Sequence, residues 1–174
     1  RGIGHAISIA LKSAGYRVAA SYAGNDTAAQ QFQVETGIPV YKFDVSNFEA
    51  SEAAVRQVEK DIGPIDVLVN NAGITRDMTF KKMTKGDWDA VMRTNLDSCF
   101  NMTKQVMDGM VDRSWGRVIN VSSVNGQKGA FGQTNYAAAK AGIHGFTKSL
   151  ALEVAKKNVT INTISPGYIG TKMV

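Results

Sequence analysis

The sequence predicts an α/β fold in which helices cover both faces of a parallel sheet. Short apolar runs typical of buried strands recur at residues 16–22, 38–43, 65–70, 117–121 and 159–164. Stretches with helical periodicity separate these runs, so strands and helices alternate along the chain. With 174 residues, 44% of them hydrophobic, the chain is long enough for one sizeable core. A single domain spanning residues 1–174 is therefore the simplest organisation.

The predicted helices begin and end at recognisable signals. Gly15 closes a first helix that starts almost at residue 1, and a turn at residues 24–26 leads into a second helix. Further helices are expected at about residues 48–61, 85–112 and 134–156. Thr134 is expected to cap the last of these, whose many Ala and Gly residues predict burial on more than one side.

Composition and charge exclude several classes of protein. The single cysteine, Cys99, rules out an internal disulfide and agrees with a reducing cytoplasm. The sequence has neither a run of 18 apolar residues nor a basic-then-apolar leader, so no membrane partner is expected. The net charge of +5 comes from scattered Lys and Arg residues, which argues against a nucleic-acid partner. No His, Cys or carboxylate grouping predicts a metal site.

Tyr136 and Lys140 form the pair that indicates chemistry. They are four residues apart in a predicted helix, so both side chains leave the same face. A free phenol titrates near pH ~10, and a nearby cation favours the phenolate, which makes a tyrosine usable as an acid or base. Ser123 follows the strand at 117–121 and could offer its hydroxyl to the same carbonyl oxygen. Together these residues predict a carbonyl reduction site.

Three further features point to a nucleotide-binding edge. Gly2 and Gly4 precede a helix as the last glycines of a dinucleotide-binding turn would, although no strand precedes them. Residues 70–73 end a strand at the edge where α/β sheets bind ligands. Asn95 is a poor helix-interior residue, and a kink, a buried hydrogen bond or a functional role would each account for it. We expect a Rossmann-type doubly wound sheet, incomplete at its first strand and its C-terminal end.

These motifs together make the chain similar to the short-chain dehydrogenase/reductase family. The matching residues, in the order and spacing of the family, are 1–4, 44–45, 70–73, 95, 123, 136–140 and 166–167. The resemblance implies that Tyr136 protonates the carbonyl oxygen and that Ser123 hydrogen-bonds to it. It also implies that Lys140 lowers the pKa of Tyr136 and holds the nicotinamide ribose, and that Asn95 anchors a water of a proton relay.

The resemblance also implies a nicotinamide cofactor. Its binding residues would be Arg1, Gly2, Ile3, Gly4, Asp44, Val45, Asn71, Ala72, Gly73, Tyr136, Lys140, Pro166, Gly167, Ile169 and Thr171. Residues 21–24 offer no carboxylate to a free ribose 2′-hydroxyl, and Arg1 could meet a 2′-phosphate. We therefore expect NADPH/NADP+ rather than NADH, with a poorly discriminating enzyme as the alternative.

A closer resemblance is to reductases of bacterial polyhydroxybutyrate synthesis, carried by residues 71–77, 124–129, 131–136 and 165–168. It implies a substrate pocket lined by Asp77, Ala130, Phe131, Gly132, Gln133, Gly167 and Tyr168. The implied reaction is the NADPH-dependent reduction of an acyl-CoA thioester, acetoacetyl-CoA, to (R)-3-hydroxybutyryl-CoA, in a cytoplasmic homotetramer. A reductase of fatty-acid synthesis that acts on acyl-carrier-protein substrates is the alternative, and a non-catalytic cofactor-binding subunit a remote one.

Overall fold

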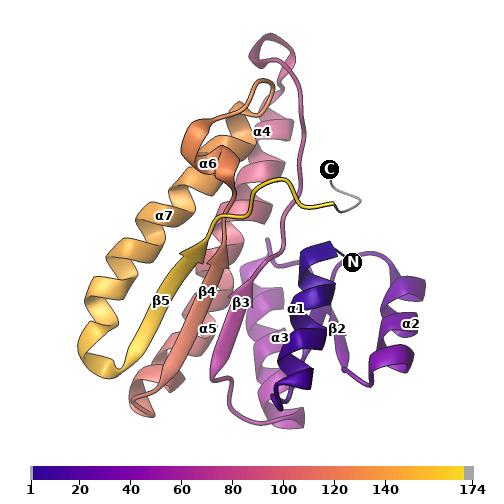
Figure 1. Ribbon diagram of the computed structural model, residues 1–174, viewed down its shortest axis with the longest axis vertical. Coiled ribbons are helices and arrows are strands. Elements are labelled where there is room, and N and C mark those ends of the chain that lie inside the picture. The colour runs from indigo at the N-terminus through magenta and orange to yellow at the C-terminus, as the bar shows by residue number, and fades with distance from the viewer. Residues whose placement is uncertain (1, 171–174) are drawn as a thin grey trace.

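The computed structural model describes residues 2–170, in which helices and strands alternate as predicted (Figure 1). The first half contains α1 (Gly2–Ser13), β1 (Ala20–Tyr22), α2 (Asp26–Thr36), β2 (Val40–Lys42), α3 (Phe48–Asp61) and β3 (Val67–Asn70). The second half contains a 3-10 turn (Phe80–Lys82), α4 (Lys85–Met92), a π-helical segment (Arg93–Asp97), α5 (Ser98–Asp112), β4 (Gly116–Val121), α6 (Val124–Lys128), α7 (Thr134–Val154), a second 3-10 turn (Ala155–Lys157) and β5 (Val159–Ile164).

The five described strands are parallel, and they form two sheets. One sheet has the order β3-β4-β5, with Leu68 opposite Val118 and Val118 opposite Ile161. The other pairs β1 with β2, with Ser21 opposite Tyr41. No strand within residues 2–170 hydrogen-bonds to both β1 and β3. That is the position in which the sequence predicts a central strand before the glycine-rich turn.

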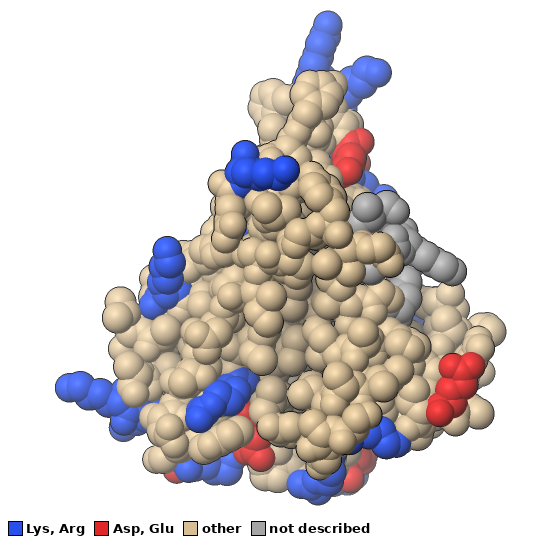
Figure 2. Space-filling model, viewed as in Figure 1, with Lys and Arg blue, Asp and Glu red and all other residues tan. Residues whose placement is uncertain are grey.

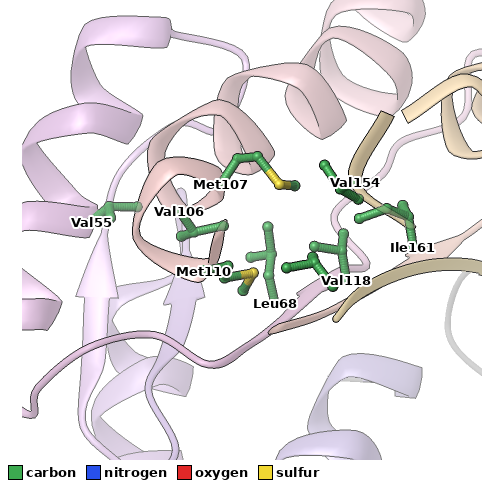
Figure 3. Packing of buried hydrophobic residues seen from close by; sticks show 9 residues of the cluster. Val55, Leu68, Val106, Met107, Met110, Val118, Val154 and Ile161 are labelled. Atoms are coloured by element: carbon green, nitrogen blue, oxygen red, sulfur yellow. The ribbon is translucent and has the colours of Figure 1, made fainter. Parts of the chain in front are cut away.

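The main core lies between the three-stranded sheet and the helices packed on it. Figure 3 shows Met107 and Met110 of α5 beside Leu68, Val118 and other apolar side chains from neighbouring strands. Buried residues recur on α5 at three- and four-residue intervals, which gives this helix one apolar face. A Cβ added to Gly116 would lie 2.5 Å from the sulfur of Met110, so β4 can approach α5 this closely only with glycine there.

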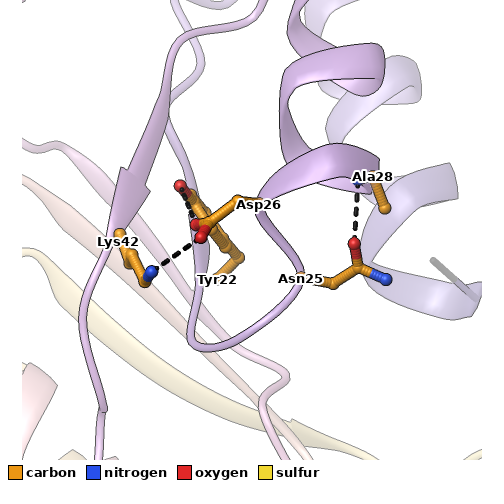
Figure 4. A network of polar contacts seen from close by, with 5 residues as sticks. All are labelled: Tyr22, Asn25, Asp26, Ala28 and Lys42. Atoms are coloured by element: carbon orange, nitrogen blue, oxygen red, sulfur yellow. Dashed lines mark hydrogen bonds and ion pairs between the residues drawn. The ribbon is translucent and has the colours of Figure 1, made fainter.

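Two predicted helix boundaries differ from those in the structure. The helix expected at 85–112 is interrupted by the π-helical segment at Arg93–Asp97. The N-cap of α7 is Gln133, which makes no side-chain capping bond, so the expected cap at Thr134 was wrong. Asn25, in the turn expected at residues 24–26, caps α2, since its side chain accepts a hydrogen bond from Ala28 N at 2.9 Å (Figure 4).

Charged side chains are dispersed over the surface. Figure 2 shows Lys and Arg side chains spread over several parts of one face rather than gathered in a single stripe. Over residues 2–170, the structure contains no grouping of three or more His, Cys, Asp or Glu residues able to hold a metal ion. Among the helices it describes, none is both long enough and apolar enough to cross a bilayer.

The packing of β5 predicts that Ile161→Ala lowers the free energy of unfolding by about 2–5 kcal/mol, because truncating a buried side chain leaves a cavity. Thr160→Ala, at the exposed neighbouring position of the same strand, should cost less than about 1 kcal/mol. Urea denaturation followed by circular dichroism measures both. Equal losses at the two positions would show that Ile161 is not part of the core.

Candidate active site

The predicted chemical residues converge at the carboxyl edge of the β3-β4-β5 sheet. Ser123 follows β4 directly, and Tyr136 and Lys140 lie in the first two turns of α7. Asn95 is in the π-helical segment. Asn95, Ser123 and Lys140 are all buried, with 1%, 9% and 3% of their surfaces exposed. The structure therefore brings together four residues that are distant in the sequence.

Lys140 is a buried cation with a backbone partner. Its Nζ donates a hydrogen bond to the carbonyl of Val121 at 2.7 Å and lies 5.7 Å from the ring centroid of Tyr136. Burial lowers the pKa of Lys140 from 10.5 to about 8. A Cβ at Gly73 would lie 3.6 Å from this ammonium and 2.5 Å from Asn95 Oδ1, so any side chain there would crowd both groups.

The pKa of Tyr136 differs from the expectation. Burial raises it above 10.0, whereas a hydrogen bond with Ser123 acts in the opposite direction. The ammonium of Lys140 donates to the Val121 carbonyl and lies 5.7 Å from the ring centroid of Tyr136, and it is not among the causes of this shift. The net shift of this pKa is therefore opposite in direction to the one expected from the neighbouring lysine. Tyr136 is a protonated phenol at neutral pH.

Asn95 has both of the structural features considered for it. The segment around it is π-helical, and its side chain is fully hydrogen-bonded. Its Oδ1 accepts from Ile74 N at 3.2 Å, and its Nδ2 donates to the carbonyls of Ile74 at 2.9 Å and Val91 at 2.8 Å. Asn95 thus ties the loop after β3 to the helix beneath the site, which explains an asparagine inside a helix.

Ser123 begins α6, a short helix that the sequence analysis did not predict. Its Oγ accepts a hydrogen bond from Asn125 N at 3.1 Å. A Cβ on Gly126 would lie 2.8 Å from the carbonyl carbon of Lys140, so α6 is in close contact with α7. This contact fixes the distance between the turn that carries Ser123 and the helix that carries Tyr136 and Lys140.

The residues predicted to line a substrate pocket lie in three segments, two of which are joined. Asp77 Oδ2 accepts from Gln133 Nε2 at 2.8 Å, and Met78 N donates to the carbonyl of Gly132 at 2.8 Å. Phe131, next to Gly132, is 95% exposed. Ala130 and Gly167 lie in the loops before α7 and after β5. Tyr168 contacts Lys128, with 3.4 Å between its hydroxyl and Nζ.

The residues predicted to hold a cofactor line the neighbouring edge. A Cβ on Gly4 would lie 2.6 Å from Asn71 Nδ2, so the start of α1 is close to the end of β3. Asp44 Oδ1 accepts from Ser46 N, and the carbonyl of Val45 accepts from Asn101 Nδ2, each at 2.9 Å. The remaining described members of this set are Gly2, Ile3, Ala72, Pro166 and Ile169. Arg1 and Thr171 lie outside the described residues.

A buried polar network beneath the site was not predicted. Asn70 Nδ2 donates to Asn120 Oδ1 at 2.8 Å, and Asn120 Nδ2 donates to Thr147 Oγ1 at 2.9 Å. Ser122 Oγ lies 3.1 Å from His144 Nε2, which joins the end of β4 to α7. The sequence does contain a signal for part of this network, since Asn70 and Asn120 each interrupt an apolar strand near its end.

The parallel strands and the glycine-lined edge, beside the buried Ser123 and Lys140 and the partly buried Tyr136, define a dehydrogenase of the nucleotide-binding α/β type. The chain belongs to the short chain dehydrogenase family, whose model matches residues 1–174. Among curated relatives, acetoacetyl-CoA reductase of Shinella zoogloeoides is 66% identical and that of Rhizobium meliloti (strain 1021) 60%, each over all of this chain and 72% of the relative. The 3-oxoacyl-[acyl-carrier-protein] reductase FabG of Vibrio harveyi is 45% identical over 99% of this chain and 71% of the relative.

The lowered pKa of Lys140 predicts a pH-dependent cost in stability. The unfolded chain binds this proton up to about pH 10.4, whereas the folded chain releases it at about pH 8. The destabilisation is therefore complete below pH 8 and is relieved as the pH rises toward 10.4. Lys140→Met removes the buried charge. Its free energy of unfolding, relative to that of the unsubstituted protein, should therefore be highest below pH 8 and should fall as the pH rises toward 10.

Denaturant unfolding at pH 7, 8.5 and 10 measures this difference. Lys148→Met, at an exposed position of the same helix, controls for losing a lysine from α7. A stability difference for Lys140→Met that stays constant across the three pH values would contradict a lowered pKa.

Proposed function

We propose that the chain carries the cofactor-binding and catalytic part of an NADPH-dependent reductase that converts acetoacetyl-CoA to (R)-3-hydroxybutyryl-CoA, as in polyhydroxybutyrate synthesis. The observation that carries this proposal is the burial of Lys140 one helical turn from Tyr136 and next to Ser123. The substrate is supported by the two relatives named acetoacetyl-CoA reductase that are 66% and 60% identical over the whole chain.

Tyr136 and Ser123 are suited to the reductive direction. The raised pKa keeps Tyr136 protonated at neutral pH, so it can supply a proton to the carbonyl oxygen of the substrate. Ser123 Oγ accepts a hydrogen bond from Asn125 N and shares a hydrogen bond with Tyr136. When the substrate is bound, the hydrogen of this hydroxyl would be donated to the reacting oxygen instead. In this assignment Tyr136 is the general acid, and Ser123 stabilises the negative charge that develops on the oxygen.

Lys140 and Asn95 would resupply the proton. With a pKa of about 8, Lys140 is protonated at neutral pH but releases a proton readily. The Nδ2 group of Asn95 donates to the carbonyls of Ile74 and Val91, and its Oδ1 already accepts from Ile74 N. The water of a proton relay would therefore bind to the backbone carbonyl of Asn95, in a π-helical segment where the regular helical bonding is interrupted.

The residues along the carboxyl edge fit a nicotinamide dinucleotide. Gly2, with φ of 57°, and Gly4 begin α1, whose free N–H groups suit a pyrophosphate, and Gly4 leaves no room for a side chain beside Asn71. Asp44 and Val45 would hold the adenine, and residues 71–73 the adenosine ribose and the pyrophosphate. Residues 166–169, with Thr171, would cover the nicotinamide, and Arg1 would meet the 2′-phosphate. The cofactor supplies the hydride.

NADPH is the favoured cofactor because no free carboxylate follows β1. The nearest one, Asp26, accepts hydrogen bonds from Tyr22 at 3.1 Å and from Lys42 at 2.9 Å (Figure 4). The bond from Lys42 is the main cause of the lowered pKa of Asp26. A carboxylate engaged in this way is poorly placed to accept bonds from a free ribose 2′-hydroxyl, the interaction that selects NADH.

We predict that kcat/KM is at least about tenfold higher with NADPH than with NADH, the ratio expected when one charge-assisted contact to the 2′-phosphate is lost. Initial rates of cofactor oxidation at a saturating concentration of the thioester measure the ratio. Equal values, or a preference for NADH, would contradict the assignment.

The main alternative differs in the carrier of the acyl group and not in the chemistry. The relative from Vibrio harveyi, at 45% identity, is named as an acyl-carrier-protein reductase, so the family includes both substrate types. A non-catalytic cofactor-binding subunit has no evident need to bring a partly buried Tyr136 together with a buried Ser123 and Lys140. The higher identity to the acetoacetyl-CoA reductases favours coenzyme A as the carrier.

The decisive experiment compares kcat/KM for acetoacetyl-CoA and acetoacetyl-carrier protein. We expect the CoA thioester to be preferred, and we expect Tyr136→Phe to lower kcat by about 10²–10⁴-fold because the general acid is lost. Tyr16→Phe, at an exposed tyrosine, is the control and should leave kcat unchanged. Preference for the carrier protein would reassign the substrate, and unchanged turnover in Tyr136→Phe would reject an enzymatic role for the site.

The proposal extends to a cytoplasmic homotetramer that assembles through α4–α5 and α7. Exposed apolar side chains on these helices support it, namely Phe100 on α5 and Leu152 on α7. Phe100 also stacks on Phe48 of α3, with ring centroids 6.1 Å apart, so an apolar surface extends beyond one helix.

A further inference from the structure

Three side chains from separate segments form one chain of hydrogen bonds beside the candidate active site. Asp77 lies in the loop after β3, Gln133 immediately precedes α7, and Asn125 is in α6. Gln133 Nε2 donates to Asp77 Oδ2 at 2.8 Å, and Asn125 Nδ2 donates to Gln133 Oε1 at 2.9 Å. Asp77 and Gln133 belong to the predicted substrate pocket, whereas Asn125 has had no role.

The charge of Asp77 determines how both amides are oriented. A carboxylate only accepts hydrogen bonds, so Gln133 must direct its NH₂ group to Asp77 and its oxygen away. That oxygen in turn requires the NH₂ group of Asn125. Asn125 Oδ1 is consequently left without a partner, and it is the sole buried side-chain nitrogen or oxygen of residues 2–170 in that state. Stability of the isolated chain alone does not account for such an atom.

Asn125 has a rigid backbone from which to hold Gln133. Asn125 is 8% exposed, and its N–H donates to Ser123 Oγ at 3.1 Å. Its carbonyl accepts from Gly129 N at 3.0 Å, which closes α6. The next residue, Gly126, lies against the Lys140 backbone too closely to admit a Cβ. Asn125 is therefore fixed relative to the catalytic residues, whereas the loop of residues 129–133 has no buried member and exposes Gly129 and Phe131.

We infer that Asn125 is a positioning residue, which sets the orientation of the Gln133 amide and thereby places the loop 129–133 for the acyl thioester. Asn125 acts through Gln133 and does not touch the reacting atoms. The inference rests on the proposed function, because Gln133 is taken to contact the substrate. The same residue anchors Ser123 through its backbone N–H, so the position of the substrate loop is coupled to that of the catalytic serine.

The first test distinguishes the role of the Asn125 side chain from that of its backbone N–H. Asn125→Ala keeps the N–H that holds Ser123 but removes the donor to Gln133. We expect KM for the thioester to rise about fivefold to tenfold, the effect of one neutral hydrogen bond. We expect kcat and KM for NADPH to stay within about twofold, because Ser123 is undisturbed. Asn162→Ala, at an exposed asparagine of β5, is the matched control and should change none of the three.

A second variant distinguishes positioning from packing. Asn125→Asp has nearly the same size, but it presents carboxylate oxygens to Gln133 Oε1. The Gln133 amide would then face two carboxylates but could donate its NH₂ group to only one of them. KM for the thioester should therefore rise more than in Asn125→Ala. A purely structural asparagine would show the reverse order, because the near-isosteric aspartate would disturb the packing less.

The double variant shows whether Asn125 acts through Gln133. In a Gln133→Ala background, Asn125→Ala should cause no further rise in KM, whereas independent effects would multiply. All constants are measured with whichever thioester the unsubstituted protein reduces faster. Effects that multiply in the double variant would overturn the inference and leave the proposed function intact. So would a fall in kcat and a rise in KM for NADPH as large as the rise in KM for the thioester. Absence of turnover in the unsubstituted protein would overturn both.

Discussion

The rest of the site depends on a charged lysine that is held away from water. Lys140 has one strong partner, the carbonyl of Val121 at the end of β4, and its burial lowers its pKa to about 8. An ammonium without further partners is costly to bury, so the surrounding structure must keep it in place. Strand β4 supplies the acceptor and α7 supplies the side chain. Ser122, just after β4, donates from its Oγ to the carbonyl of Lys140 at 2.7 Å and so joins the two elements.

The polar network beneath the sheet edge fixes the positions of β3, β4 and α7 relative to one another. Asn70 and Asn120 are opposite each other in β3 and β4, and Thr147 extends their bonds to α7. Buried polar groups that satisfy one another specify a single arrangement of the elements they join, because a shifted register would leave them unpaired. This network aligns the strand ends that carry Ser123 with the helix that carries Tyr136. The site is therefore positioned from below by hydrogen bonds and from the side by close packing.

Much of this could be predicted from the sequence, because the relevant signals are local. Buried parallel strands appear as apolar runs, and the four-residue spacing of Tyr136 and Lys140 places them on one helix face. The short helix α6 and the π-helical segment around Asn95 depend on tertiary contacts, and local propensity does not encode them. The raised pKa of Tyr136 results from burial and could not be inferred from the nearby lysine.

The close contacts of the glycines have a consequence for how this protein could change. Gly73 and Gly126 each occupy a position beside a site residue where an added methyl group would lie within 3 Å of a neighbouring atom. The chemical centre is therefore intolerant of added volume. The rim that carries Phe131 and Tyr168 is open to solvent and has no such restriction. In the proposed reductase, substitutions of Phe131 or Tyr168 would thus change the rim of the substrate pocket without adding volume to the buried centre.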